Sequence, residues 1–132
     1  FAMLRFSDAP VARWLMAVLP GQDVSQLKSG EVFGFGVDAG EASYSDPAAH
    51  KRISDAFAAD PETFSRTFHA LERGGHGGAN WAHLETDAGS MVIFSSGLGD
   101  GFYTSYFGYD ASGNVCALVT DFNLVEWAKR PQ

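Results

Sequence analysis

Two apolar runs dominate the second half of the chain. Met91–Phe94 and Val115–Val119 are apolar at every position, and short runs of this kind are typical of strands covered on both faces. Between them lie a glycine-rich bend at residues 97–101 and a long aromatic segment, and Asp110–Asn114 has the composition of a compact hairpin turn. The pattern predicts three successive antiparallel strands at the centre of a sheet.

The N-terminal residues predict a strand followed by a helix. Phe1–Phe6 looks like a strand in mid-course, so we expect it to pair within the sheet and interpret the chain as part of a longer polypeptide. Ser7–Pro10 carries helix-start signals, and Pro20-Gly21 would end a helix. Between them one apolar stripe recurs at helical spacing, formed by Val11, Trp14, Leu15, Val18 and Leu19.

The segment Glu31–Asp38 is predicted to be the next strand. Gly34 and Gly36 share one face of it, which indicates a bend or a close approach by something else. An aromatic ring lying flat on the backbone and a bound ligand are the two alternatives. Gly40 then allows a turn, and Glu41–Ser45 can return as a short strand.

Two Asp-Pro pairs, Asp46-Pro47 and Asp60-Pro61, are each typical of a helix start. The spacing predicts inward side chains on both helices, namely Ala49, Ile53, Ala56 and Phe57 on the first, and Phe64, Phe68 and Leu71 on the second. Arg73–Asn80 contains four glycines in eight residues, which favours a mobile loop. Trp81–Thr86 is then predicted to be a strand.

These elements favour an α+β fold, with a mainly antiparallel sheet or sandwich and two or three helices packed outside it. A doubly wound α/β fold would need strands that alternate with helices, and residues 85–122 predict several strands in succession. The length of 132 residues suits a single domain. We interpret residues 1–132 as the C-terminal part of a longer protein with an N-terminal segment missing.

Charge narrows the classes of partner. The chain has 16 acidic and 9 basic residues and a net charge of −7. This balance argues against binding to nucleic acid or to an anionic membrane. It permits a basic protein partner, and ordinary solubility is the more common reason for such a charge. The single Cys116 lies in an apolar run and is expected to be an inert core residue, which suits a cytoplasmic location.

Candidate chemistry rests on oxygen-bearing side chains, because the four histidines show no zinc spacing. The acids and hydroxyls singled out are Asp38, Asp46, Ser95, Ser96, Asp100, Tyr103 and Asp121. If the strands that carry them are neighbours, Asp38, Asp46 and Asp100 converge at one sheet end and could bind Ca²⁺ or Mg²⁺. No other cofactor is expected. Alternatively each carboxylate only holds its own turn, with Asp100 accepting from backbone N–H groups across the bend.

Three segments in combination resemble the bacterial family called domain of unknown function 4241. They are VARWLMAVLPGQD, FGFGVDAGEASYSD and SSGLGDGFYTSYFGYDASGNVCALVTDF, so the resemblance runs from about Ala9 to Phe122. The chain departs from the family pattern at Leu98, where Trp is common, and at Thr104, where Pro is common. The resemblance implies no activity, substrate or cofactor. It matches the family pattern at Trp14, Gly21, Gly36, Asp38, Gly40, Asp46, Ser96, Gly97, Gly99, Asp100, Gly101, Tyr103, Gly108, Asp110, Gly113, Asp121 and Phe122.

Two functional hypotheses follow. The first is a non-enzymatic, cytoplasmic binding protein of acidic character that masks a basic partner, as immunity proteins do. The second is a hydrolase-like or metal-binding module in which Asp38, Asp46 and Asp100 form the site and the Arg73–Asn80 loop is a lid. In this second hypothesis Asn80, Ser96 and Tyr103 are neighbours of the carboxylates. Neither spacing nor motif names a base and nucleophile pair.

Overall fold

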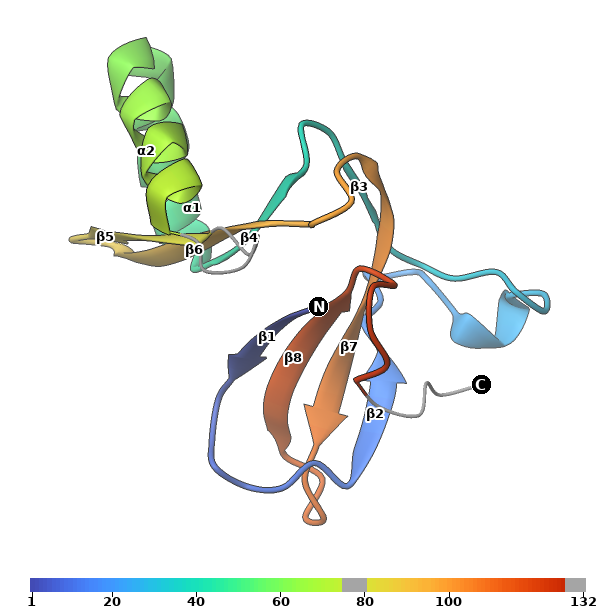
Figure 1. The fold of residues 1–132 in the computed structure, drawn as a ribbon. Helices are drawn as coiled ribbons and strands as arrows, with labels where there is room; N and C mark the ends of the chain where they lie inside the picture. The colour runs from blue at the N-terminus through green and yellow to red at the C-terminus, as the bar shows by residue number, and fades with distance from the viewer. Residues whose placement is uncertain (75–80, 128–132) are drawn as a thin grey trace. The chain divides into compact units, whose positions relative to one another are not determined.

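The chain forms two compact units, which we describe separately. Unit 1 consists of Phe1–Asp38 and Asp100–Gln132, and unit 2 of Ala39–Gly99. The computed structural model describes residues 1–74 and 81–127, apart from the side chains of 64, 68 and 70–74. Within this part, eight strands pair in antiparallel sheets and two α-helices are present, which confirms the predicted α+β class (Figure 1).

Unit 1 is built on one antiparallel sheet. Its strands follow the order β1 (Ala2–Arg5), β8 (Val115–Asp121), β7 (Gly101–Tyr109) and β2 (Arg13–Met16), and β3 (Phe35–Val37) pairs with the other half of β7. Strand β1 pairs with β8 in a register that sets Met3 opposite Val119. The prediction that the N-terminal strand pairs within the sheet is therefore confirmed.

The helix predicted before Leu19 is wrong, because Arg13–Met16 is strand β2. Trp14 pairs with Gly108 and Met16 with Tyr106 across the ladder to β7. A Cβ at Gly108 would lie 2.8 Å from the Trp14 ring, so the indole occupies the space that a side chain there would fill. Pairing with a long central strand outweighs a helical pattern of only two turns. The predicted apolar stripe is not buried as a unit, since Leu19 is 69% exposed.

The strand predicted over Glu31–Asp38 is shorter than expected, and its two glycines differ. Only Phe35–Val37 forms a strand, which pairs with β7. A Cβ at Gly34 would meet the carbonyl oxygen of Tyr103 and lie 2.9 Å from the ring of Phe102, whereas one at Gly36 would meet nothing within 4 Å. The predicted close approach therefore occurs at Gly34, where backbone and an aromatic ring both contribute.

Unit 2 is a three-stranded sheet with two helices on one face. The sheet has the order β4 (Glu41–Ser45), β6 (Gly89–Ser95) and β5 (Trp81–Thr86). Helices α1 (Pro47–Ala59) and α2 (Pro61–Gly74) lie on the same side of it (Figure 1). The strands at Glu41–Ser45 and Trp81–Thr86 have the bounds that the sequence predicts.

The core of unit 2 lies between α1 and the central strand β6. Ile53 of the helix packs against Met91 and Ile93 of the strand, and all three are buried. Phe57, Ala82 and Leu84 surround this cluster. The prediction of inward side chains on α1 is confirmed for Ala49 and Ile53, while Ala56 is exposed and was wrongly placed inward.

The three strands predicted as one sheet centre are divided between the two units. Strand β6 pairs with β4 and β5, whereas β7 pairs with β8, β2 and β3. The bend between β6 and β7 contains Gly97 and Gly99, both with positive φ, a conformation that glycine adopts easily. The chain therefore leaves one ladder at this bend and starts another.

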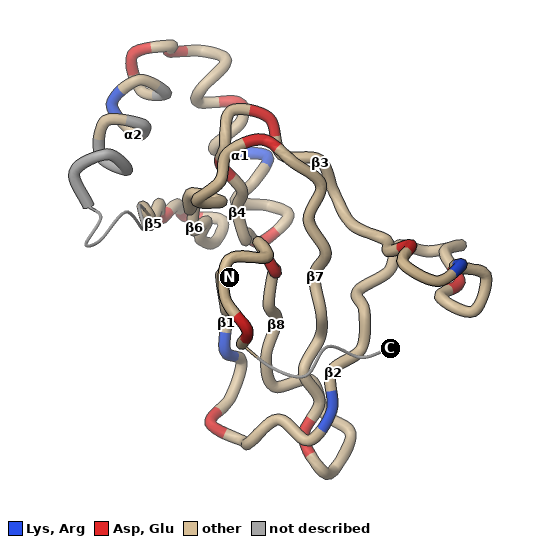
Figure 2. Tube along the Cα trace, turned by 45° about the vertical axis from the view of Figure 1, so that its right-hand side comes forward, with Lys and Arg blue, Asp and Glu red and all other residues tan. Residues whose placement is uncertain are grey.

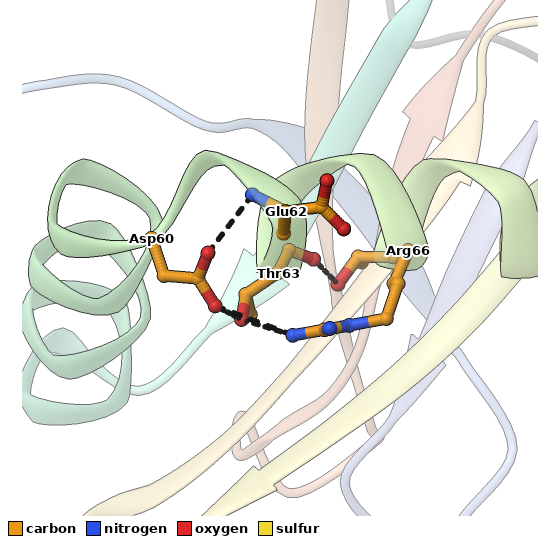
Figure 3. Close-up of polar contacts among 5 residues, drawn as sticks. Asp60, Glu62, Thr63 and Arg66 are labelled. Carbon is orange, nitrogen blue, oxygen red and sulfur yellow. Dashed lines mark hydrogen bonds and ion pairs between the residues drawn. The ribbon is translucent and has the colours of Figure 1, made fainter.

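Both predicted helix starts are confirmed, and of the two aspartates Asp60 is the one whose side chain caps its helix. Its Oδ1 accepts from the Glu62 backbone N–H at 3.0 Å, and its Oδ2 accepts from the Thr63 hydroxyl at 2.6 Å (Figure 3). Arg66 donates to the same oxygen at 3.3 Å. These partners, the Thr63 hydroxyl foremost, hold the pKa of Asp60 below its ordinary value.

Several predictions concern parts of the chain that are not described. These are the inward side chains Phe64, Phe68 and Leu71, and residues 75–80 of the predicted loop, Asn80 included. Within the described part, no helix is long and apolar enough to cross a membrane. The predicted hairpin at Asp110–Asn114 is present, with Asp110 Oδ1 accepting from the backbone N–H groups of Ser112 and Asn114.

Candidate functional site

The residues predicted to form one site belong to different units. Asp38, Asp100 and Tyr103 lie in unit 1, and Asp46 and Ser96 lie in unit 2. Each group is therefore considered within its own unit. Asn80 lies outside the described residues.

Asp38 and Asp100 come together at one end of the β3–β7 ladder. The last pair of this ladder is Val37 with Gly101, so Asp38 and Asp100 stand at the next opposed positions, where Cα atoms of antiparallel strands are about 5 Å apart. Both residues are exposed. A Cβ at Gly101 would lie 2.9 Å from the Tyr103 hydroxyl oxygen, which places that phenol beside the same strand end. The sequence interpretation grouped Asp38 and Asp100 with Asp46, which lies in unit 2.

Within the described residues, no group of three or more His, Cys, Asp or Glu side chains is arranged to hold a metal ion. The strand end of unit 1 contributes two carboxylates, Asp38 and Asp100. Like charges at opposed positions of a ladder repel each other. What they offer chemically is a pair of hard oxygen ligands for a cation.

Ser96, rather than Asp100, holds the glycine-rich bend. The Ser96 side chain is fully buried at 0% exposure. Its hydroxyl donates to the Gly99 carbonyl at 2.6 Å and accepts from the Gly99 N–H at 3.2 Å. The alternative, in which Asp100 accepts from backbone N–H groups across the bend, is not seen among the described contacts. The Ser96 hydroxyl instead bonds both the N–H and the carbonyl of Gly99. Ser96 therefore has a structural role.

Asp46 also has a structural role, at the turn between β5 and β6. Its Oδ2 accepts from the Ser90 backbone N–H at 3.1 Å, and no side-chain hydrogen bond caps α1. A Cβ at Gly89 would lie 2.6 Å from the same oxygen. The carboxylate thus joins the start of α1 to the start of β6, which explains an acid at this position without a ligand.

Unit 1 contains a cleft with a volume of about 730 Å³. One wall is the segment of residues 24–32, which begins with the single 3₁₀ turn η1 (Val24–Gln26). The base is formed by alternate side chains of β7 together with β2 and the end of β8. Its lining residues are Met16, Val24, Leu27, Lys28, Ser29, Gly30, Glu31, Val32, Phe102, Thr104, Tyr106, Asp121 and Asn123.

The ladder register explains why these side chains meet. Thr104 pairs with Asp121 and Tyr106 pairs with Met16, and opposed residues point to the same face of a sheet. Phe102 joins them because residues two apart on a strand share a face. Thr104, Tyr106 and Asp121 are buried at 7%, 5% and 3% exposure, whereas Phe102 is 56% exposed. The cleft therefore has a fixed base and a rim that is open to solvent.

Asp121 is the acidic group at the base of this cleft. Its Oδ1 accepts from the Asn123 backbone N–H at 2.8 Å, and Asn123 has a φ of 57°, which asparagine tolerates better than most residues. The bond turns the chain away from β8 and fixes the carboxylate. The sequence interpretation included Asp121 among its oxygen-bearing residues but did not place it with Met16 or Leu27. Residues 102, 104 and 106 are alternate positions of one strand, and this spacing could have indicated that their side chains share the face that lines the cleft.

Comparison with known proteins identifies the family. The family model described as "Protein of unknown function (DUF4241)" matches residues 1–120. No curated protein and no solved structure matches the chain. The match covers most of the chain and agrees with the resemblance in the segments from Ala9 to Phe122. The chain belongs to the DUF4241 family.

Proposed function

We propose that this protein is a non-enzymatic binding protein whose acidic unit 1 takes a basic protein partner in the cytoplasm. The observation that carries the proposal is the way unit 1 holds its carboxylates. They accept hydrogen bonds from backbone N–H groups, which fix the side chain without bringing a positive side chain to it. Their negative charge therefore remains available to a partner.

Three contacts in unit 1 follow this pattern. Each joins a carboxylate oxygen to a backbone nitrogen at 2.8 or 2.9 Å: Asp23 with Ser25, Glu31 with Lys28, and Asp110 with Asn114. The described cations of unit 1 are few, lying in β1, in β2 and in the loop that follows β2 (Figure 2). They are Arg5, Arg13 and Lys28.

In unit 2, three of the eight acids form ion pairs with a cation among the described contacts. Lys51 and Asp55 lie 2.6 Å apart, Arg52 and Asp87 also 2.6 Å, and Arg66 and Asp60 3.3 Å. The described part of unit 1 holds eight acids and three cations, so we assign the attraction for a basic partner to this unit. Immunity proteins, which cover a toxin to neutralise it, are one class with this role, and the likeness is one of composition alone.

A capture experiment with a variant of reduced negative charge tests the proposal. The protein is immobilised and exposed to a lysate of its native host at about 10 mM salt, where the screening length is about 30 Å. The control carries Asp8→Asn, Asp38→Asn and Asp100→Asn, three exposed acids of unit 1. We expect a basic protein on the wild-type matrix that is depleted on the control and that elutes near 0.5 M salt.

The captured protein is then purified, and its dissociation constant is measured between 20 and 200 mM salt. Electrostatically steered binding weakens steeply over such a range. Equal recovery by wild type and control, or an affinity that does not change with salt, would contradict the proposal.

A second candidate function is divalent-cation binding at Asp38 and Asp100. The register that opposes these two acids favours it, because Mg²⁺ is commonly held by one or two carboxylates while it keeps several waters. Thermal unfolding with Mg²⁺, Ca²⁺ and Mn²⁺ tests the idea. A cation at a hundredfold excess over its dissociation constant should stabilise the fold by about 2.7 kcal/mol. Asp100→Asn should remove that gain, and Asp110→Asn should leave it.

A further inference from the structure

We propose that unit 2 binds an extended segment of a protein partner, which adds to strand β4 as a further strand and places one large apolar side chain between β4 and helix α1. This goes beyond the proposed function, because the site lies in unit 2 and recognises a backbone together with an apolar side chain. Three features of unit 2 support it: an open strand edge, a groove beside that edge, and the register that joins the two.

Strand β4 is an edge of the unit 2 sheet, with β6 as its partner among the described residues. The Asp46 N–H donates to the Ser90 carbonyl at 3.1 Å. The Gly40 carbonyl accepts from the Ser96 N–H at 2.8 Å, so the even-numbered positions of this segment direct their backbone groups toward β6. Successive residues of a strand direct these groups to opposite sides. The N–H and carbonyl of Ser43, which is exposed, therefore face the open edge and can pair with another strand.

A groove with a volume of about 250 Å³ lies between β4 and α1. Its base is apolar and consists of Met91 and Ile93 of β6 with Ile53 and Phe57 of α1. The volume is below the roughly 300–1,000 Å³ of sites for drug-sized ligands, so the groove suits a single side chain. The other lining residues are Glu41, Ala42, Ser43, His50 and Ser54.

The register of the sheet aligns the open edge with this groove. Ser43 pairs with Ile93, which packs against Ile53 of α1. Because opposed residues point to the same face of a sheet, Ser43 lies on the face that carries α1. A residue that pairs with Ser43 from the open side has its side chain on this face as well. One residue of the added segment can therefore bond to the Ser43 backbone and also fill the groove.

This arrangement specifies the chemistry of the partner segment. In strand addition, main-chain hydrogen bonds give affinity and pockets for alternate side chains give specificity. A leucine or phenylalanine would cover the apolar base of the groove. The chain has a net charge of −7, and among the described residues neither β4 nor the groove lining contains Lys or Arg. Lysine or arginine beside the apolar residue is therefore favoured, whereas a second copy of this chain carries the same charge and is repelled.

The test uses a blocked heptapeptide, acetyl-Lys-Thr-Val-Leu-Val-Thr-Lys-amide, whose leucine should pair with Ser43. It is titrated into the full chain and followed by amide and methyl NMR shifts. We expect saturable shifts at Ser43, Met91 and Ile93, and slower hydrogen exchange of the Ser43 N–H. Alanine in place of the leucine should weaken binding at least about tenfold, as expected for loss of a buried apolar side chain. Glutamate in place of both lysines should weaken binding as well.

N-methylated peptides distinguish strand addition from contact between apolar side chains alone. A methyl group on the leucine nitrogen removes the N–H that would donate to the Ser43 carbonyl, and should weaken binding at least about tenfold. The matched control carries the methyl group on the nitrogen of the following valine. That N–H points away from β4, so the affinity should change by less than about threefold.

Variants of Ser43 test the same hydrogen bonds from the side of the protein. Ser43→Pro removes the N–H at an edge position, where proline is tolerated, and should abolish the peptide-induced shifts at Met91 and Ile93. Ser43→Ala keeps the N–H and should bind within about twofold of wild type. If Ser43→Pro does not fold, the N-methylated peptides decide, since they leave the protein unchanged.

Equal affinity of the two N-methylated peptides, full binding by a folded Ser43→Pro, or no saturable binding at about 1 mM heptapeptide overturns the proposal. Hydrogen exchange of the protein without peptide gives a further check. Protection of the Ser43 N–H that increases with protein concentration would identify a second copy of this chain as the occupant, and would overturn the assignment to a partner segment.

Discussion

At the scale of single residues, this chain uses short polar side chains and glycines to fix its bends. The Ser96 hydroxyl both donates to and accepts from the backbone of Gly99 while it is fully buried. The buried hydroxyl thereby satisfies its own hydrogen-bonding groups. The residue that resembled a binding group in the sequence is therefore one that shapes the chain before Asp100.

Ser96→Ala should destabilise the protein by about 1–3 kcal/mol, because it removes the two hydrogen bonds that the buried Ser96 hydroxyl makes with the backbone of Gly99. Urea unfolding followed by circular dichroism measures the change. Ser112→Ala, at an exposed hairpin position, is the control and should stay within about 0.5 kcal/mol of wild type. A loss of similar size in both variants would contradict the role of the Ser96 hydroxyl.

Gly34 and Gly36 should respond differently to the same substitution. Gly34→Ala places a methyl group against the Tyr103 carbonyl and the Phe102 ring, and overpacking of this kind costs about 1–3 kcal/mol. Gly36→Ala meets open space and should be neutral, or stabilise by up to about 1 kcal/mol through the unfolded chain. Unfolding free energies of the two variants decide the point, and equal values would count against it.

At the scale of elements, turns and helix starts were readable from the sequence because their signals are local. Asp60-Pro61 and Asp110–Asn114 each determine their own backbone within a few residues, and the structure shows both. Arg13–Met16 was misread because its partner, β7, lies far away in the sequence. Over four residues, a pattern of alternating polar and apolar positions can also fit the apolar stripe of a helix, so the pattern alone does not decide between strand and helix.

The capped turns and helix start should make stability fall in acid. Hydrogen bonds from Thr63 to Asp60, from Ser25 to Asp23 and from Asn114 to Asp110 lower the pKa of each carboxyl below the ordinary 3.8. With a folded pKa below the unfolded one, the unfolded chain binds more protons in this range. The stabilisation is thus complete above about pH 5 and is lost as pH falls through the folded pKa values.

Urea midpoints measured from pH 7 to pH 3 should decline below about pH 4.5. Asp60→Asn should be less stable at pH 7 and show a shallower decline, since it removes one of the three linked protons. Asp55→Asn, which changes an exposed pair with Lys51, is the control. A midpoint that rises in acid would show that these carboxyls do not carry the linkage.

At the scale of the whole molecule, the candidate cleft shows where sequence reasoning ends. Its lining comes from β2, the segment of residues 24–32, β7 and the end of β8, and only the ladder register brings these together. The sequence offered the approach of Asp38 to Asp100 only on the condition that their strands are neighbours, and the β3–β7 ladder supplies that condition. The division of Asp46 and Ser96 into unit 2 was not, because the bend at Gly97–Gly99 moves the chain from one sheet to another.

Unit 2 is inserted where a hairpin turn would otherwise join β3 and β7. Val37 pairs with Gly101, and a Cβ at Gly40 would lie 3.2 Å from the Gly99 Cα, so unit 2 starts and ends at neighbouring points. Replacing Ala39–Gly99 by Asn-Gly, a two-residue hairpin loop, should leave unit 1 with strand-rich circular dichroism and dispersed NMR signals. Removing Asp38 as well shifts the register by one residue and should abolish that dispersion. Disorder in both designs would contradict the insertion.

The neighbouring positions of Gly40 and Gly99 also bear on the order in which the chain folds. Unless unit 2 is already folded, β3 must find β7 across a flexible connection of about sixty residues, and closing a loop becomes harder by about 0.6 kcal/mol with each doubling of its length. Once unit 2 has folded, that connection behaves like one of about four residues, a gain of about 2.4 kcal/mol over four halvings. The pairing of β3 with β7, although distant in sequence, can then form as quickly as one between neighbouring segments. Folding of unit 2 should therefore precede the closing of β3 onto β7, and with it the formation of the strand end that holds Asp38 and Asp100.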